Sequence, residues 1–585
     1  MYRAVVLLCL CIWLAVPVST GQAVDIRGDT LASDLRERLE REVRGDQVPE
    51  TRFEARRLAN RAAERLGNYL NSLGFFSATV APGVEAGPPP TAYVTVTPGP
   101  KFTLAKVEIE TVGDTLPEDI RRAMRSAADL HEGAPITPDA VIEAETAIVA
   151  NLRANGYAFA KAMPREVLGD ANAATISVTF KVAPGSPVLL GEVEFGDGLR
   201  MRRRALEVLV PFAAGTPYRP EHLEELNRRL GATRLFSVFN AQLAPAPAGT
   251  TETGAAIHNV VLTLIERDRY TISAGASFST NEGAGVDGEW TRRNFTRRGD
   301  TLTLHAVGAA QERSLGAEWR YPHAFGYGRS LELSAEAGRE ETDAFDRESL
   351  VAAIALDIER NPRLTYAFAA TSEITRETDT QGERDLQILS VSGAARLDET
   401  DSALDPKRGW RADLRVEPGT VVGDEATNYV STVGQASLYR PLDEDARWVA
   451  AARMRTGFVF GADTLELPTS RRFFAGGGGS ARGYAFQSIG PEDETGQPLG
   501  GRGLMEAAAE LRWRRSDRLG FAAFVDGASV TARDVPSFND MRFGAGIGVR
   551  YYTVVGPIRL DIATPLSPRD GDDPVQLYIS IGQAF

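Results

Sequence analysis

Apolar and polar residues alternate with a period of two through most of the chain after about residue 267. The alternation is clearest in segments 331–337, 410–416 and 448–454. This pattern predicts strands with one apolar and one polar face, typical either of a membrane barrel or of a soluble sandwich. At about 20 residues for each strand and its turn, residues 267–585 predict about sixteen antiparallel strands.

The chain before residue 267 mixes helical and strand patterns. Apolar residues spaced by three and four, from Leu58 to Leu73, predict a helix that ends at Gly74. A second helix is predicted from Thr137-Pro138, with one apolar face up to Leu152 and an end near Gly156. Glycine at both ends fits a left-handed C-cap.

These landmarks recur at a fixed distance. The Pro-Gly pair at 98–99 reappears at 184–185, and each pair lies between two predicted strands. A third copy of the helix end, near Phe236, lacks the glycine. We therefore expect three α+β repeats, at 24–100, 101–186 and 187–266, followed by a β-domain at 267–585. Three unrelated α+β domains are the alternative interpretation.

Residues 1–23 have the pattern of a secretory signal peptide, with Arg3, an apolar core and small residues before Ala23. Both cysteines, Cys9 and Cys11, lie inside it. After it, no run of about 18 apolar residues predicts a spanning helix, so a closed barrel is the remaining way to cross a membrane. The signal peptide, the missing cysteines and the length favour the membrane barrel over the sandwich.

Composition argues against several other functions. The formal net charge of -14 does not suggest a nucleic-acid partner. The five histidines are scattered and form no metal-ligand spacing, and none lies near an obvious nucleophile motif. We therefore expect no metal, no cofactor and no enzymatic activity.

One segment stands out as a functional candidate. Four glycines at 476–479 precede Arg482-Gly483-Tyr484. An arginine enclosed by a barrel needs a carboxylate partner, and Glu510 and Asp526 on two later strands are candidates. From spacing alone, an exposed arginine in a flexible external loop is an equally good interpretation.

The chain resembles the BamA/TamA superfamily of outer-membrane assembly factors, in which periplasmic POTRA domains precede a sixteen-stranded barrel. Arg482-Gly483-Tyr484 is similar to the Arg-Gly-aromatic motif of the sixth loop, which folds into the barrel in that family. Phe524 and Asp526 match its Phe-x-Asp-x-Gly strand motif, although Ala528 replaces the last glycine. Glu510 matches the acid of the preceding strand less securely. The resemblance implies a loop latch formed by Arg482, Gly483, Tyr484, Glu510 and Asp526.

The resemblance also extends to the end of the chain. Leu577, Ile579, Ile581 and Phe585 are expected on one strand face, and Phe585 resembles the aromatic signal recognised during barrel insertion. Gly582 is expected to weaken the seam between the last and first strands.

The family resemblance implies a function at the bacterial outer membrane, with the repeats in the periplasm. Three repeats are typical of the TamA branch, whose partner TamB is anchored in the inner membrane and reaches the POTRA domains. A TamA-like factor would assemble autotransporters or other unfolded barrel clients into the lipid through a lateral gate. The alternatives are a BamA-like factor, a two-partner-secretion transporter, or a passive pore or receptor barrel.

Overall fold

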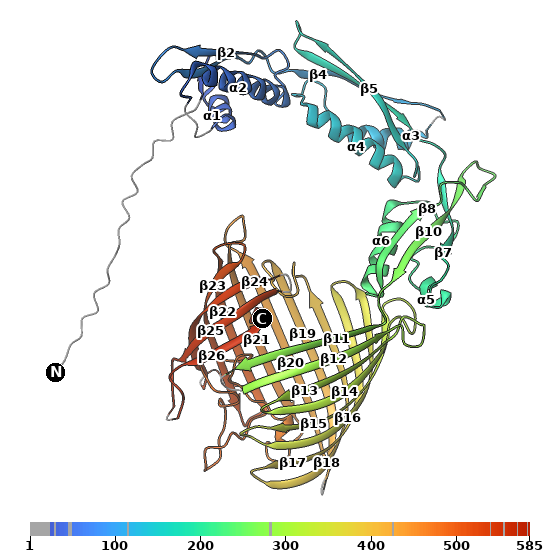
Figure 1. The fold of residues 1–585 in the computed structure, drawn as a ribbon. Coiled ribbons are helices and arrows are strands. Elements are labelled where there is room, and N and C mark those ends of the chain that lie inside the picture. Colours follow the sequence, from blue (N-terminus) through green and yellow to red (C-terminus); the bar gives the residue numbers. More distant parts are fainter. Residues whose placement is uncertain are drawn as a thin grey trace, which may run out of the picture. The chain divides into compact units, whose positions relative to one another are not determined.

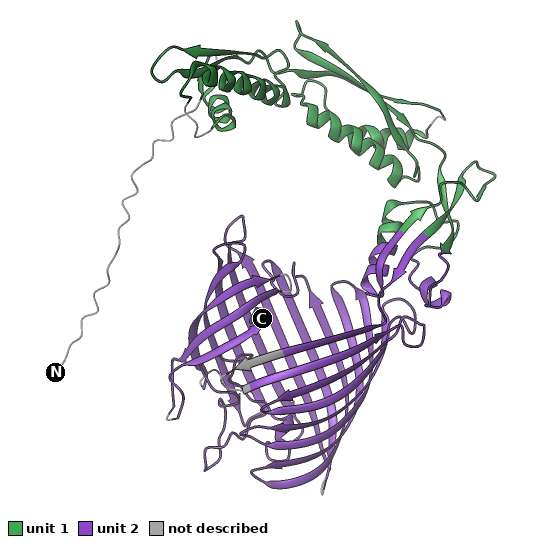
Figure 2. Cartoon of the chain, in the orientation of Figure 1, with its two compact units in different colours: residues 1–194, 212–225, 241–261 green, residues 195–211, 226–240, 262–585 purple. Residues whose placement is uncertain are grey.

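The computed structural model describes residues 24–28, 31–44, 49–113, 116–279, 283–423, 426–536, 538, 540–553, 556–569, 571–581 and 583–585. The predicted signal peptide and Gly582 lie outside the described residues. The chain forms two compact units (Figure 2). One contains the chain up to 194 with 212–225 and 241–261, and the other contains 195–211, 226–240 and 262–585.

The first repeat folds as a small sheet with two helices. Strands β1 (Asp25–Arg27), β3 (Thr91–Thr97) and β2 (Thr79–Glu85) lie in that order, and the helices are α1 (Ser33–Glu42) and α2 (Arg52–Ser72). A capping box between Thr51 and Glu54 starts α2. The buried face of α2 includes Leu66 and Leu70, which belong to one hydrophobic core with residues of β1 and β3.

The second repeat has the same type of architecture. Its sheet order is β4 (Thr103–Thr111), β6 (Thr175–Ala183) and β5 (Lys161–Asp170), with helices α3 (Glu118–Ala128) and α4 (Pro138–Ala154). The side chain of Thr137 accepts a hydrogen bond from the Ala140 amide at 3.2 Å, and Pro138 occupies the first turn of α4. Gly156 has φ +98°, so the helix ends in the left-handed region expected from the sequence.

The division between the two units passes through the third repeat. Its sheet order is β7 (Val188–Phe195), β10 (Ala256–Glu266) and β8 (Phe236–Leu243), and β9 (Gly249–Thr250) pairs with β10. The helices are α5 (Arg203–Glu207) and α6 (Pro220–Ala232). After α6, Arg234 takes φ +56°, so a non-glycine residue adopts the positive φ that glycine supplies in the other two repeats.

Residues from 270 onward form a closed barrel of sixteen strands, β11 to β26, each antiparallel to its neighbours (Figure 1). The predicted class, α+β repeats followed by an all-β barrel of about sixteen strands, is confirmed. The strands are β11 (Tyr270–Ser279), β12 (Gly283–Arg293), β13 (Thr301–Ala309), β14 (Glu312–Tyr321), β15 (Arg329–Glu341), β16 (Asp346–Asn361), β17 (Leu364–Asp379), β18 (Gly382–Asp398), β19 (Gly409–Val422), β20 (Ala426–Pro441), β21 (Trp448–Phe460), β22 (Gly503–Arg514), β23 (Leu519–Thr531), β24 (Arg542–Thr553), β25 (Gly556–Pro565) and β26 (Gln576–Ile581).

The two faces of the barrel strands differ in the way that the alternation predicts. Large apolar side chains such as Leu315, Leu350 and Phe368 are exposed on the outside. Charged side chains such as Glu510 and Arg550 are buried on the inside. Among the residues that the structure describes, no helix is both long and apolar enough to cross a membrane.

The core of the first repeat provides a stability test with an adjacent control. Leu66 is fully buried in α2, so Leu66→Ala is expected to destabilise this repeat by about 2–5 kcal/mol. At the neighbouring Gly67, an added Cβ meets nothing within 4 Å, so Gly67→Ala is expected to stabilise α2 by about 0.5–1 kcal/mol. Amide hydrogen exchange across residues 52–72 measures both effects, and equal exchange in the two variants would contradict the assignment of the buried face.

Candidate functional site: an arginine-anchored loop inside the barrel

The connection between β21 and β22, residues 461–502, folds against the inner wall of the barrel. Ala475, Ala481, Tyr484 and Ile489 of this loop are buried against Leu504 of β22 and against Ala528 and Val530 of β23. An arginine within such a buried segment has left bulk water, and it therefore needs compensating negative charge.

Three acids supply that charge to Arg482, and they lie on β22, β23 and β25. Its Nε donates to Oδ2 of Asp526 at 2.6 Å, and its Nη2 donates to Oδ1 of the same carboxylate at 2.9 Å. Its Nη1 donates to Glu510 at 3.2 Å and to Asp561 at 2.9 Å. The guanidinium carbon lies 3.3 Å from the centre of the Phe524 ring. The planar fork of arginine therefore satisfies one carboxylate through two parallel bonds and two more through its remaining nitrogen.

Further arginines balance the charge of these acids. Arg512 Nε donates to Glu510 at 3.0 Å. Arg550 donates to Glu510 at 3.2 Å and to Asp561 at 2.5 Å. Arg559 Nε also lies 3.5 Å from Asp561, so the result is a buried network of four arginines and three carboxylates in which each acid contacts at least one arginine.

Gly483 allows the loop to approach the wall closely. It has φ +104°, and a Cβ at this position would lie 2.8 Å from the Thr564 carbonyl oxygen. Opposite it, a Cβ on Gly544 would lie 2.0 Å from the Arg482 carbonyl oxygen. The tight contact therefore depends on glycine both in the loop and in β24.

Tyr484 and Tyr578 link the loop to the last strands. The Tyr484 hydroxyl donates to the Phe543 carbonyl at 3.0 Å. The Tyr578 hydroxyl on β26 accepts from the Gly483 amide at 3.1 Å and donates to the Tyr484 carbonyl at 3.2 Å. The structure thus brings all five predicted site residues into one region, and their role as a latch stays a prediction.

Asp561 was not predicted from the sequence as a partner of Arg482. The available signal was the alternation in β25, where Arg559 and Asp561 are buried between the exposed residues Ile558, Leu560 and Ile562. The alternation alone does not show that the inward-facing side of β25 contacts the loop, because that contact depends on the strand register.

A second attachment of the loop was also missed. The Thr469 amide donates to Glu377 at 2.5 Å, its hydroxyl donates to Asp379 at 2.6 Å, and the Ser470 amide donates to Glu377 at 3.2 Å. Arg471 forms an ion pair with Glu373. Since these acids lie on β17, the loop is attached to two well-separated groups of strands, through 469–471 and through Arg482.

The structure corrects the expected position of Phe585. Strand β26 ends at Ile581, so the period of two no longer applies at Phe585. The Phe585 ring lies 5.5 Å from the guanidinium carbons of both Arg453 and Arg512, and Arg512 donates to the Phe585 carbonyl at 3.1 Å. Phe585 therefore packs against inward-facing arginines and does not share the outward face of Ile579. Its predicted role as an insertion signal is not tested by this position.

Comparison with known proteins identifies the architecture. The Omp85 superfamily domain matches residues 294–585, and a POTRA domain, described as a surface antigen variable number repeat, matches residues 102–185. The chain belongs to the Omp85 superfamily. Membership confirms the expected BamA/TamA relationship, and it places this Omp85 barrel in the outer membrane with POTRA domains in the periplasm.

Relatives of this Omp85 protein carry the name BamA. The outer membrane protein assembly factor BamA of Nitratidesulfovibrio vulgaris is 24% identical over 509 residues, which cover 83% of this chain and 62% of the relative. BamA of Neisseria meningitidis serogroup B is 22% identical, with 85% and 68% coverage. The chain therefore spans about two thirds of the length of these relatives. The crystal structure of Haemophilus ducreyi BamA lacking POTRA domains 1–3 is similar in fold, with TM-score 0.67, 18% identity, and coverage of 81% of this chain and 99% of that one.

The geometry of Arg482 leads to a test of the loop. Arg482→Lys keeps the positive charge but loses the two parallel donors to Asp526, so the loop is expected to lose about 2 kcal/mol of attachment. Amide exchange in residues 476–490 should then rise by at least about tenfold. The separate contacts of 469–471 provide an internal reference whose exchange should not change.

Arg313→Lys is a matched control, because Arg313 is exposed on β14 and is remote from the loop in the barrel sheet. If 476–490 exchanged equally in both variants, the bidentate contact would not be what holds the loop.

Proposed function

We propose that this chain is a TamA-like outer-membrane insertion and translocation factor, which assembles autotransporters or other barrel clients through a lateral gate between β11 and β26. The observation that carries the proposal is the pairing at that seam. Among the described residues, β11 and β26 share one aligned pair, Ser279 with Tyr578, whereas β11 and β12 share ten pairs and β25 and β26 share six. Strands separate more easily where fewer backbone groups are paired, so the short pairing among the described residues supports opening between β11 and β26.

An open seam exposes the edges of two strands. Unpaired amide and carbonyl groups on β11 and β26 accept a client strand by main-chain hydrogen bonding, which does not depend on the sequence of the client. A barrel client is built from such strands, so one gate serves many clients. The proposal includes no enzymatic step and no cofactor.

The loop has a defined place in this mechanism. Tyr578 lies in the seam pair and also hydrogen-bonds Gly483 and Tyr484. We propose that the Arg482 latch, with Asp526 and Glu510, keeps the β22–β26 side of the gate rigid while the pairing to β11 is lost. The latch would then fix the shape of the edge on which a client strand is added.

The periplasmic repeats are proposed to receive the partner and the clients. In the second repeat, β5 is the edge strand of its sheet and is exposed along its whole length. Its exposed apolar residues include Val167 and Leu168. Such an edge suits addition of an extended segment. Three repeats, with the proposed boundaries 24–100, 101–186 and 187–266, support a TamB-like partner anchored in the inner membrane.

A reversible cross-link tests the gate. The pair Ser277→Cys on β11 and Ser580→Cys on β26 lies two residues from the described seam pair, Ser279 with Tyr578, and leaves Tyr578 unchanged. Oxidation is expected to reduce assembly of an unfolded barrel client in proteoliposomes by at least about tenfold, because added strands need the free edges. A reductant should restore assembly.

The control cross-link joins two ordinary neighbours. Ala335 and Ala352 are paired on β15 and β16, so Ala335→Cys with Ala352→Cys should form a disulfide without affecting assembly. Full client assembly by the oxidised seam variant would refute the lateral gate.

Affinity isolation of the full-length chain from membranes tests the partner. A long inner-membrane-anchored protein is expected, and Leu168→Asp on the β5 edge should reduce its recovery by several-fold, because a charge interrupts strand addition. Ile142→Asp, on the exposed surface of α4, is the control. Recovery of peripheral lipoproteins instead would favour the BamA-like alternative, and a large stable conductance without client assembly would favour a passive pore.

A further inference from the structure

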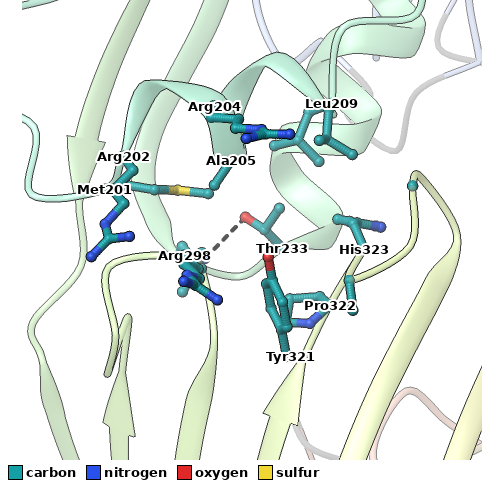
Figure 3. A pocket seen from close by; sticks show the side chains of 15 residues that line it. Met201, Arg202, Arg204, Ala205, Leu209, Thr233, Arg298, Tyr321, Pro322 and His323 are labelled. Carbon is teal, nitrogen blue, oxygen red and sulfur yellow. Dashed lines mark hydrogen bonds between the residues drawn. The ribbon is translucent and has the colours of Figure 1, made fainter.

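A cavity of about 440 Å³ lies within the second unit, away from the loop and the seam. One side is formed by residues 201–209 around α5 and by Thr233 and Leu235. The other side is formed by the turn between β12 and β13 and the turn between β14 and β15. Figure 3 shows Arg204 on the first side and Arg298, Tyr321 and His323 on the opposite side.

The residues that line the cavity include arginines but no acidic residue. Arg202, Arg204 and Arg298 line the cavity, and no aspartate or glutamate does. Their neighbours in sequence are paired, since Arg200 contacts Glu266 and Arg203 contacts Glu207. In the part of the chain that the structure describes, no ion pair involves the three lining arginines.

Asp300, an acid in the same turn as Arg298, already accepts hydrogen bonds from other residues. Asp300 is fully buried, and its carboxylate accepts hydrogen bonds from the Thr296 amide at 2.8 Å and from the Trp319 indole at 2.7 Å. It therefore organises the turn that presents Arg298. Because the Arg298 side chain is exposed, its donors are available to a ligand.

His323 adds a neutral donor. Burial, together with the nearby charge of Arg229, lowers the pKa of His323 to about 4. The ring is therefore neutral at pH 7, and its Nδ1 accepts a hydrogen bond from the Gly328 amide at 3.0 Å. This leaves the proton on Nε2, so the ring contributes an N–H donor to the lining.

The floor of the cavity is apolar. Met201, Leu209 and Leu235 are buried there. A Cβ on Gly299 would lie 2.9 Å from the Met201 methyl carbon, so the floor is closely packed. A basic rim over an apolar floor suits an anionic group that carries carbon substituents.

The position in the barrel is consistent with such a ligand. The lining turns lie at the barrel end where β11 begins, which is the periplasmic end. Tyr270, Trp290 and Tyr321 lie near this end of their strands. Aromatic girdles of this kind mark the level of lipid headgroups in outer-membrane barrels.

We propose that this cavity binds a phosphate-bearing anion, whose oxygens are held by Arg204 and Arg298 with Arg202 and His323 at the rim. Both a phospholipid headgroup at the periplasmic face of the membrane and a soluble phosphate have this chemistry. Arginine suits it because its planar fork donates two parallel bonds to phosphate oxygens. The bound anion would join the α5 segment to the first barrel turns, and this inference does not depend on the gate or on a partner.

The test uses the full-length chain and the triple variant Arg202→Gln, Arg204→Gln, Arg298→Gln. The control is Arg360→Gln, Arg408→Gln, Arg518→Gln, which removes the same charge from exposed residues at the same barrel end, one at the end of β16 and two in turns. In one arm, native mass spectrometry measures retention of phosphatidylglycerol and of phosphatidylcholine. In a second arm, inorganic phosphate is titrated while amide exchange is followed in 201–209 and 294–300.

The unmodified chain and the control should retain phosphatidylglycerol in preference to phosphatidylcholine. The cavity variant should bind phosphatidylglycerol at least about tenfold more weakly, because it loses the arginine donors to the phosphate oxygens that the control keeps. Loss confined to the inorganic phosphate arm would support a soluble phosphate ligand. If the cavity variant and the control bound both probes equally, the site would be overturned. Unchanged exchange in other regions of the barrel shows that the variant is folded.

Discussion

A positively charged side chain held inside the barrel is the constraint on which the functional region depends. Moving an ion out of water costs several kcal/mol even after a protein relaxes around it, and only well-placed opposite charges offset that cost. Arg482 meets this requirement with Asp526, Glu510 and Asp561. Those acids in turn require Arg512, Arg550 and Arg559, because three carboxylates around one guanidinium would leave excess negative charge. The loop and strands β22–β25 therefore form one electrostatic unit.

The same requirement explains the small residues around the site. The guanidinium reaches the acids only if the loop backbone lies directly on the wall, and Gly483 and Gly544 permit that approach. The residues of this site therefore depend on one another. Arg482 is needed to pair with the acids, and Gly483 and Gly544 are needed because the backbones lie so close together. The second attachment, through Thr469 and Glu377, needs no glycine, because a backbone amide and a hydroxyl supply its donors.

The sequence predicts those parts of the molecule that local periodicity or a compact motif encodes. Strand alternation predicts the barrel and its strand number, and helical spacing predicts the buried face of α4 with its proline start. The motif identifies Arg482, Asp526 and Glu510. Asp561 and Glu377 are not predicted, because a residue's partners across a lumen depend on strand register and barrel closure. Phe585 is misplaced because the strand that governs the alternation ends before it.

The sequence distances within the arginine network have a consequence for the order in which the chain is built. Arg482 is separated from Glu510 by 28 residues, from Asp526 by 44 and from Asp561 by 79. Contacts between distant residues form only after the intervening segments are in place. The complete network therefore cannot exist before β25 has joined β24. Until then Arg482 lacks Asp561 as a partner, so the loop reaches its full attachment only late in the formation of this barrel.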